Sequence, residues 1–104
     1  MKHGTDVRPK KWSNVLDLYD HNDYSAIWGN YEESAERVLG VRWNGESEDD
    51  LGYPNMAGYP VWYVEPKFLR QSILLDLLKL VNNLDDNRKD EYINNILLAL
   101  RENT

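Results

Sequence analysis

The tripeptide Gly-Tyr-Pro occurs twice within nine residues, at 52–54 and at 58–60, and the second copy continues into Val61-Trp62-Tyr63-Val64. Glycine reaches backbone angles that other residues avoid, whereas proline fixes φ and has no amide proton to donate. A segment that combines both with large aromatic residues is typical of a loop with one defined shape. We therefore expect residues 51–64 to form an ordered loop that carries aromatic side chains.

The length and composition indicate a single globular domain over residues 1–104. Domains typically contain about 100–150 residues, and a chain of this size buries a core without a disulfide or a metal. The hydrophobic fraction of 41% and the charged fraction of 29% are ordinary for a globular protein. The sequence has no cysteine, which excludes disulfides, thiol catalysis and thiolate metal sites.

The charge is unevenly distributed along the chain. The net charge is −6, yet residues 1–12 carry a local charge of +3, from Lys2, Arg8, Lys10 and Lys11 against Asp6. We interpret residues 1–12 as a flexible basic arm. The remaining acidic body would be repelled by nucleic-acid phosphates, so we expect no nucleic-acid partner.

No segment of the sequence is typical of a secretory signal or of a membrane-spanning helix. The N-terminus lacks the apolar stretch of a secretory signal. The longest apolar-rich stretch, Phe68–Leu84, is interrupted by Arg70, Asp76 and Lys79 and is too polar to span a bilayer. We expect a cytoplasmic protein without a membrane partner.

The first forty residues favour helices. Ser13 is a suitable N-cap for a short helix over 13–20. Apolar residues then follow helical spacing from Tyr24 to Leu39, which predicts either one helix or two that meet at Gly29. Asn30 and Glu33 resemble a capping box, and Gly40 is placed to end the helix in a left-handed conformation.

The central region favours two strands. Val41–Trp43 predicts a short strand that ends at the turn dipeptide Asn44-Gly45, and Tyr59–Val64 predicts an antiparallel partner for it. In a continuous strand, Tyr59, Val61 and Tyr63 share one face, whereas Trp62 and Val64 share the other.

The last forty residues predict two antiparallel helices. Pro66 suits the first turn of a helix that continues to about Asn82, with an apolar arc wide enough for burial on several sides. A polar turn with Asp85 or Asp86 as the cap precedes a final helix over about 88–101, which would bury Tyr92, Ile93, Ile96, Leu97 and Leu100. The predicted fold class is α+β, with an N-terminal helical segment, a small two-stranded antiparallel sheet and a C-terminal antiparallel helical hairpin.

The segments Arg42-Trp43-Asn44-Gly45, Gly52-Tyr53-Pro54 and Gly58–Pro66 together resemble short bacterial proteins of the kind carried on mobile, integron-type gene cassettes. The likeness covers about residues 41–78. It implies a bacterial, cytoplasmic accessory protein, and it brings no catalytic or binding residues because that group has no assigned biochemical role.

Few residues suggest catalysis or metal binding. The acidic run Glu46, Glu48, Asp49 and Asp50 lacks the alternating ligand spacing of a calcium loop and is typical of a solvated loop. His21 lies between Asp20 and Asp23, which could orient it as a general base, but no nucleophile or phosphate-binding loop accompanies it. We expect no catalytic residues, no metal and no cofactor, and the sequence favours a protein without enzymatic activity.

The aromatic residues around the loop are the candidate binding residues: Trp43, Tyr53, Tyr59, Trp62 and Tyr63. In one interpretation Trp43 and Trp62 pack on the third helix and the Gly-Tyr-Pro turns cover the core. In another, the three tyrosines line a groove for a peptide, a second subunit or a flat apolar ligand. The two interpretations are compatible if one face of the strand packs in the core and the other face binds a partner.

Our leading hypothesis is a non-enzymatic interaction module that binds a protein partner or itself, as a possible homodimer, through the aromatic loop and the exposed strand edge. The acidic body would suit an inhibitor or antitoxin-like role against a basic partner. The alternative is a small-molecule-binding protein or minor enzyme with a pocket beneath the Gly-Tyr-Pro loop, in which His21 or an acidic residue supplies the polar group.

Overall fold

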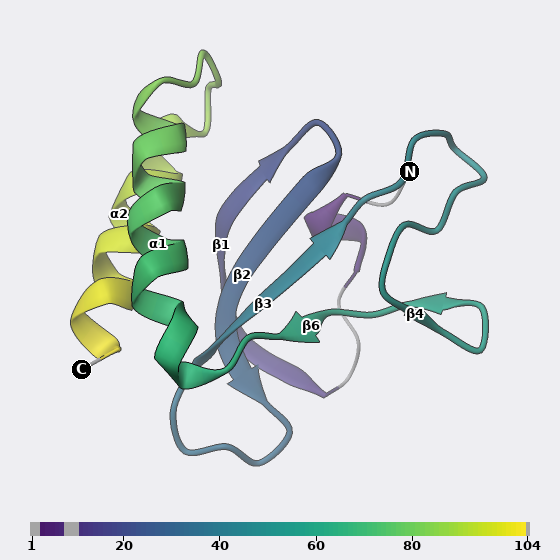
Figure 1. The fold of residues 1–104 in the computed structure, drawn as a ribbon, viewed down its shortest axis with the longest axis horizontal. Helices are drawn as coiled ribbons and strands as arrows, with labels where there is room; N and C mark the ends of the chain where they lie inside the picture. Colours follow the sequence, from purple (N-terminus) through teal and green to yellow (C-terminus); the bar gives the residue numbers. More distant parts are fainter. Residues whose placement is uncertain (1–2, 8–10, 104) are drawn as a thin grey trace.

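Four antiparallel strands form a sheet, and two C-terminal helices cover one of its faces (Figure 1). The structure is a computed structural model that describes residues 3–7 and 11–103. The sheet has the order β1-β2-β3-β6, and β4 and β5 form a separate two-stranded hairpin. The elements are a short 3-10 turn η1 (Gly4–Asp6), β1 (Trp12–His21), β2 (Tyr24–Tyr31), β3 (Val38–Trp43), β4 (Asn55–Met56), β5 (Tyr59–Pro60), β6 (Tyr63–Val64), α1 (Lys67–Asn82) and α2 (Lys89–Glu102).

The predicted N-terminal helical segment is wrong, because residues 13–20 and 24–31 form a β-hairpin. His21 pairs with Tyr24, and Asn22 takes a positive φ of 53° in the turn. Both faces of β2 are covered, with Ala26 in the core beneath the helices and Ile27 in a second core on the other face. A strand that is buried on both sides loses its polar–apolar alternation, and its apolar residues here imitate helical spacing.

Gly40 does not end a helix but lies inside β3. A Cβ atom on Gly40 would lie 2.9 Å from Cη2 of Trp12, so the missing side chain makes room for that indole ring. The predicted capping box is also wrong, because Asn30 belongs to β2.

The antiparallel pairing of the two predicted strands is confirmed: Gly40 pairs with Val64, and Val41 with Tyr63. The sheet nevertheless has four strands rather than two. The predicted strand over 59–64 is split, because β5 pairs with β4 whereas β6 pairs with β3. The interruption changes which side chains lie on the same side, so the predicted common face of Tyr59 and Tyr63 is lost.

The C-terminal helical hairpin is confirmed. Pro66 is the N-cap of α1, and the Arg88 amide donates to Oδ1 of Asp86 (2.8 Å) just before α2. The expected burial of α1 on several sides is not observed, because Phe68 is 82% exposed and Leu80 is 53% exposed; on α2, Leu97 is exposed as well. In the part of the chain that the structure describes, no helix is long and apolar enough to cross a bilayer.

The main core lies between the helices and the sheet. Its buried side chains come from β1, β2, β3 and both helices: Leu18, Ala26, Trp28, Leu39, Val41, Leu74, Leu77, Val81, Tyr92, Ile96 and Ala99. Polar contacts add to this packing, since the Tyr92 hydroxyl donates to the Asp20 carbonyl (3.1 Å) and Arg88 forms an ion pair with Asp17 (3.0 Å).

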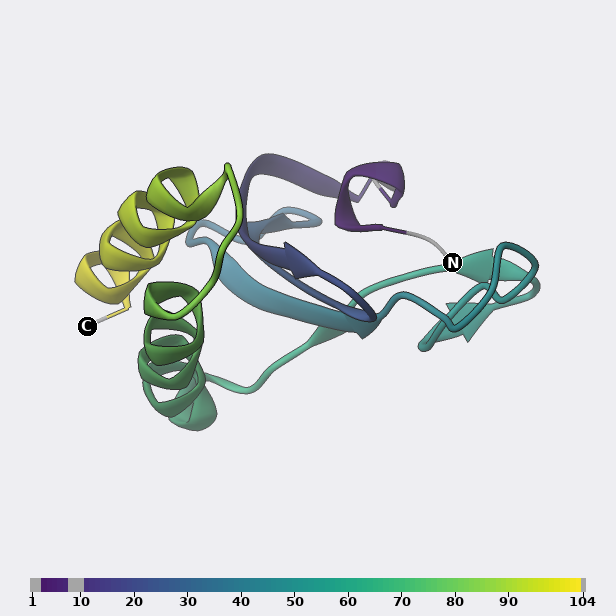
Figure 2. The same ribbon diagram turned by 90° about the horizontal axis from the view of Figure 1, so that it is seen from above.

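A second, smaller core covers the opposite face of the sheet. Figure 2 shows the helical pair at one side of the sheet, and η1 with the β4–β5 hairpin at the other. Val7, Trp12, Ile27 and Trp62 are buried here, and the Trp62 indole donates to the Val7 carbonyl (2.9 Å). Residues 3–7 of the predicted arm thus lie against the sheet; its basic residues Lys2, Arg8 and Lys10 lie outside the described residues.

Candidate functional site

A buried arginine holds the Gly-Tyr-Pro loop in place. Arg42 extends from β3 and is only 1% exposed. Its Nη1 donates to the carbonyls of Val61 (2.7 Å) and Pro54 (3.4 Å), and its Nη2 donates to the carbonyl of Leu51. One guanidinium therefore joins the beginning of the loop, the first Gly-Tyr-Pro turn and the residue that follows the second.

The charge of Arg42 is met by carbonyl dipoles. Among the residues that the structure describes, no carboxylate lies within ion-pair distance of it, and its Nε has no hydrogen-bond partner. Burial lowers the pKa of Arg42, but an arginine remains protonated at neutral pH because its ordinary pKa is so high. The guanidinium is therefore a fixed cation that three main-chain oxygens surround.

Backbone pairing supports the same loop from β3. The amide of Trp43 donates to the Tyr53 carbonyl (2.7 Å), and the amide of Tyr53 donates back to the Trp43 carbonyl (2.9 Å). Gly52 has a φ of +75°, and a Cβ there would lie 2.0 Å from the Trp43 oxygen. Only glycine fits this close approach of two backbones.

The acidic run ends in an ordered turn. Asp50 accepts hydrogen bonds from the amides of Glu46 (3.0 Å) and Gly52 (2.9 Å), and these bonds lower its pKa. The side chains of the run are exposed. The turn thus places a set of carboxylates beside the loop and leaves most of them in contact with solvent.

The structure divides the five predicted binding residues between two sides of the loop. Trp43, Tyr53 and Tyr63, which we call the aromatic surface, line a hollow of about 270 Å³ together with Tyr24 and Glu65. They are 53%, 67% and 53% exposed. The Trp43 ring meets the edge of Tyr24 with centroids 4.7 Å apart. Trp43 does not pack into the helical core, contrary to one of our two interpretations.

Tyr59 and Trp62 lie on the other side of the loop, in a groove of about 480 Å³ beneath the β4–β5 hairpin. We call it the aromatic groove; its lining residues are Lys11, Trp12, Tyr31, Met56, Ala57, Tyr59, Val61 and Trp62. Trp62 is 6% exposed and Tyr59 is 72% exposed. Sequence reasoning missed Trp12 and Tyr31, whose rings lie 5.1 Å apart, because one was placed in an arm and the other in a helix. The lining includes neither His21 nor any carboxylate.

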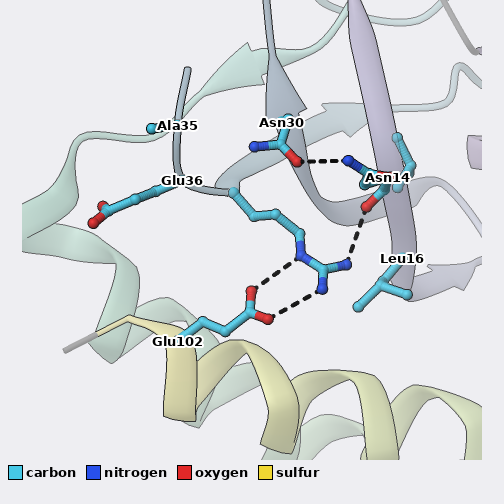
Figure 3. A pocket seen from close by; sticks show the side chains of 8 residues that line it. Asn14, Leu16, Asn30, Ala35, Glu36 and Glu102 are labelled. Atoms are coloured by element: carbon cyan, nitrogen blue, oxygen red, sulfur yellow. Dashed lines mark hydrogen bonds and ion pairs between the residues drawn. The ribbon is translucent and has the colours of Figure 1, made fainter. Parts of the chain in front are cut away.

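A larger, polar cavity of about 630 Å³ lies between the sheet and the end of α2 (Figure 3). Arg37 forms ion pairs with Glu102 at 3.1 Å through Nε and Nη2, and its Nη1 donates to the Asn14 carbonyl (3.1 Å). The Asn14 amide donates to Asn30 (3.1 Å), and the Trp28 indole donates to Glu102 (2.7 Å). These polar groups already bind one another. Their contacts hold α2 against the sheet and leave few hydrogen-bonding groups for a ligand.

His21 has a different partner from those that the sequence suggested. Its Nδ1 lies 3.3 Å from Oδ2 of Asp86, in the turn before α2, whereas Asp20 accepts a hydrogen bond from Ser25 (3.0 Å). The His21–Asp86 contact joins the β1–β2 turn to the helical hairpin. Within residues 3–7 and 11–103, no group of three or more His, Cys, Asp or Glu residues is arranged to hold a metal ion.

Comparison of the chain with protein-family models, curated proteins and solved structures finds no match. Function is therefore inferred from the geometry of the two aromatic sites. They lie on opposite sides of one loop, and Arg42 fixes the backbone that both share.

Proposed function

We propose that this chain is a non-enzymatic protein-interaction module that binds a basic protein through the aromatic surface of Trp43, Tyr53 and Tyr63. The observation that carries the proposal is the anchoring of these exposed rings by buried Arg42. Tyrosine and tryptophan dominate binding energy at protein interfaces, and a contiguous exposed patch of such side chains is typical of an interaction site.

Rigidity favours binding because a loop that is already ordered loses little entropy when a partner docks. The Trp43–Tyr53 backbone pair and the three bonds of Arg42 hold the backbone from which the rings project before any encounter. Ordering an immobilised side chain costs about 0.5–1.5 kcal/mol at an interface, and pre-organisation reduces that cost.

Charge indicates the kind of partner. The exposed carboxylates of Glu46, Glu48 and Asp49 adjoin the loop, and the whole chain carries a net charge of −6. Carboxylates beside an aromatic centre attract a basic surface and speed encounter with it. A second copy of this acidic chain would bring like charges together across a two-fold axis, so the proposed partner is a different, basic protein rather than a homodimer.

The strand edge has a minor part in this proposal. The sheet has two edge strands, β1 and β6, and the one next to the aromatic surface is β6, which has only two residues, Tyr63–Val64. Strand addition draws its affinity from a row of main-chain hydrogen bonds, and a two-residue strand offers few. The side chains of the aromatic surface therefore supply most of the binding energy.

The test compares two variants that both change exposed side chains. The double variant Tyr53→Ala/Tyr63→Ala removes two rings of the aromatic surface, whereas Leu80→Ala removes an apolar side chain that is 53% exposed on α1. Each protein is immobilised and used to capture partners from a lysate of the source organism, and captured proteins are re-measured for affinity after purification. A basic protein should bind the unchanged chain and Leu80→Ala but lose at least about tenfold in affinity for the double variant.

Equal capture by all three proteins would contradict the proposal. Sedimentation equilibrium of the unchanged chain tests the remaining possibility: a stable dimer that the double variant abolishes would show that the aromatic surface binds a second copy instead of a basic protein.

A further inference from the structure

We propose that the aromatic groove is a second binding site, and that it takes an extended proline-rich peptide in the polyproline II conformation. The site goes beyond the proposed function, because it lies on the other side of the loop from the aromatic surface.

The walls of the groove suit proline rings. Trp12, Tyr31, Tyr59 and Trp62 come from β1, β2, the hairpin and the link before β6, and they enclose about 480 Å³ together with Met56 and Val61. Trp12 and Trp62 are 8% and 6% exposed, so their rings are held by packing. Proline-rich segments dock in grooves lined by aromatic side chains, and their preformed helix loses little entropy on binding.

The indole of Trp12 supplies the polar contact that such a peptide needs. Two other buried indoles have acceptors: that of Trp28 donates to Glu102, and that of Trp62 donates to the Val7 carbonyl. The Trp12 N–H has no acceptor among the residues that the structure describes, and its nitrogen is not one of the buried unpaired atoms, so it is open to solvent. A tryptophan N–H usually takes a hydrogen-bond partner where one can reach it. The backbone of polyproline II has no internal hydrogen bonds, so each of its carbonyls is free to accept one.

The rim of the groove indicates the residue that flanks the prolines. Lys11 lines the groove and pairs with Glu32 at 3.6 Å, and both side chains are more than half exposed. An exposed pair of this kind contributes little stability and exchanges partners readily. An arginine beside the proline run can take Glu32 as its partner through a bidentate contact.

The experiment uses the full chain and a synthetic polyproline peptide that carries one terminal arginine. The chain has four tryptophans, and their indole N–H signals are assigned by single Trp→Phe variants in proton–nitrogen NMR. On titration, the Trp12 and Trp62 signals should shift and saturate, whereas the signal of the core residue Trp28 should not move. A glycine-serine peptide with the same arginine controls for charge and should produce no saturable shift.

Two variants locate the contact. Trp12→Phe keeps an aromatic ring in place but removes the N–H donor and part of the indole, and it should weaken peptide binding about three- to tenfold. Tyr59→Ala changes an exposed residue that does not threaten folding, and it should weaken binding while Tyr53→Ala, on the other side of the loop, leaves it unchanged.

Each contrary outcome overturns the groove proposal. These outcomes are no shift at millimolar peptide, a shift confined to the Trp43 indole, unchanged binding by Tyr59→Ala, or Trp12 shifts that depend on protein concentration without peptide and so report a second copy. The two proposals fail separately. Loss of peptide binding leaves capture through Tyr53 and Tyr63 intact, and an unaffected double variant leaves the groove intact.

Discussion

The Nη1 atom of Arg42 lies 2.7 Å from the carbonyl oxygen of Val61, nineteen residues later in the chain. Val61 links β5 to β6, so this bond holds the point at which the chain passes from the hairpin to the main sheet. The same guanidinium also binds the Leu51 and Pro54 carbonyls. Four consequences of this arrangement and of the surrounding core can be measured.

Replacing Arg42 should cost more than replacing any exposed arginine. Arg42→Met leaves three acceptors without their donor, and an unpaired buried group costs about 1–3 kcal/mol, so we expect the free energy of unfolding to fall by at least about 3 kcal/mol. Arg37→Met is the control, because Arg37 also binds a carbonyl and a carboxylate but is partly exposed. Urea denaturation measures both. A loss below about 1 kcal/mol for Arg42→Met would contradict the anchoring role.

Two aromatic residues of the groove should differ sharply in stability. Trp62→Ala removes a ring that is 6% exposed and should cost about 3–5 kcal/mol. Tyr59→Ala removes a ring that is 72% exposed and should change stability by no more than about 0.5 kcal/mol. Thermal and urea unfolding measure the stability of both variants. Similar losses of unfolding free energy would contradict the assignment of Trp62 as a core residue and Tyr59 as an exposed one.

Two glycines with similar backbone angles provide a matched test of close approach. Gly52 and Gly58 have φ values of +75° and +81°. A Cβ on Gly58 meets nothing within 4 Å, so Gly58→Ala should cost only the conformational strain of about 1–2 kcal/mol. Gly52→Ala should cost clearly more, because its Cβ would collide with the backbone of Trp43 and separate it from Tyr53. Equal losses of unfolding free energy in urea denaturation would contradict the close approach of the two backbones at Gly52.

Stability should decline in alkali partly through Tyr92. Burial raises the pKa of Tyr92 to about 12, from an ordinary value of 10.0. The phenol therefore ionises first in the unfolded chain, so its stabilising contribution is complete below pH 10 and is lost as pH rises towards 12. Tyr92→Phe should flatten this part of the pH dependence and should also cost about 0.5–1.5 kcal/mol at neutral pH, because its hydrogen bond to Asp20 is lost. Unfolding free energies measured between pH 8 and pH 11.5 test both expectations; an unchanged slope in the variant would mean that other groups carry the effect.

The helical hairpin was predictable because each helix begins at a local signal. Pro66 and Asp86 mark the two starts, and the apolar spacing of α2 reports one buried face. The β1–β2 hairpin was not predictable in the same way. Its strands have apolar residues on both sides, since one face meets the helices and the other meets Val7 and Trp62. A period of two is visible only when one face is polar.

The residues of the candidate site were predictable from the sequence, but their arrangement in space was not. The density of glycine, proline and tyrosine indicated a shaped loop, and Tyr53, Tyr59 and Tyr63 are indeed exposed on it. The division into two sites depends on where the strand is interrupted, at Val61 and Trp62, and no local pattern reports that. Trp12 lies in the groove because β1 pairs with β2, and the sequence was not read as containing either strand.

Arg42 recognises only main-chain oxygen atoms of the loop, so nothing in its bonding depends on which side chains the loop displays. Residues at positions 53, 56 and 59 can therefore be exchanged while the backbone keeps its course. Randomised libraries at these positions, selected against unrelated targets, would turn the loop into a small antibody-like scaffold that contains no cysteine.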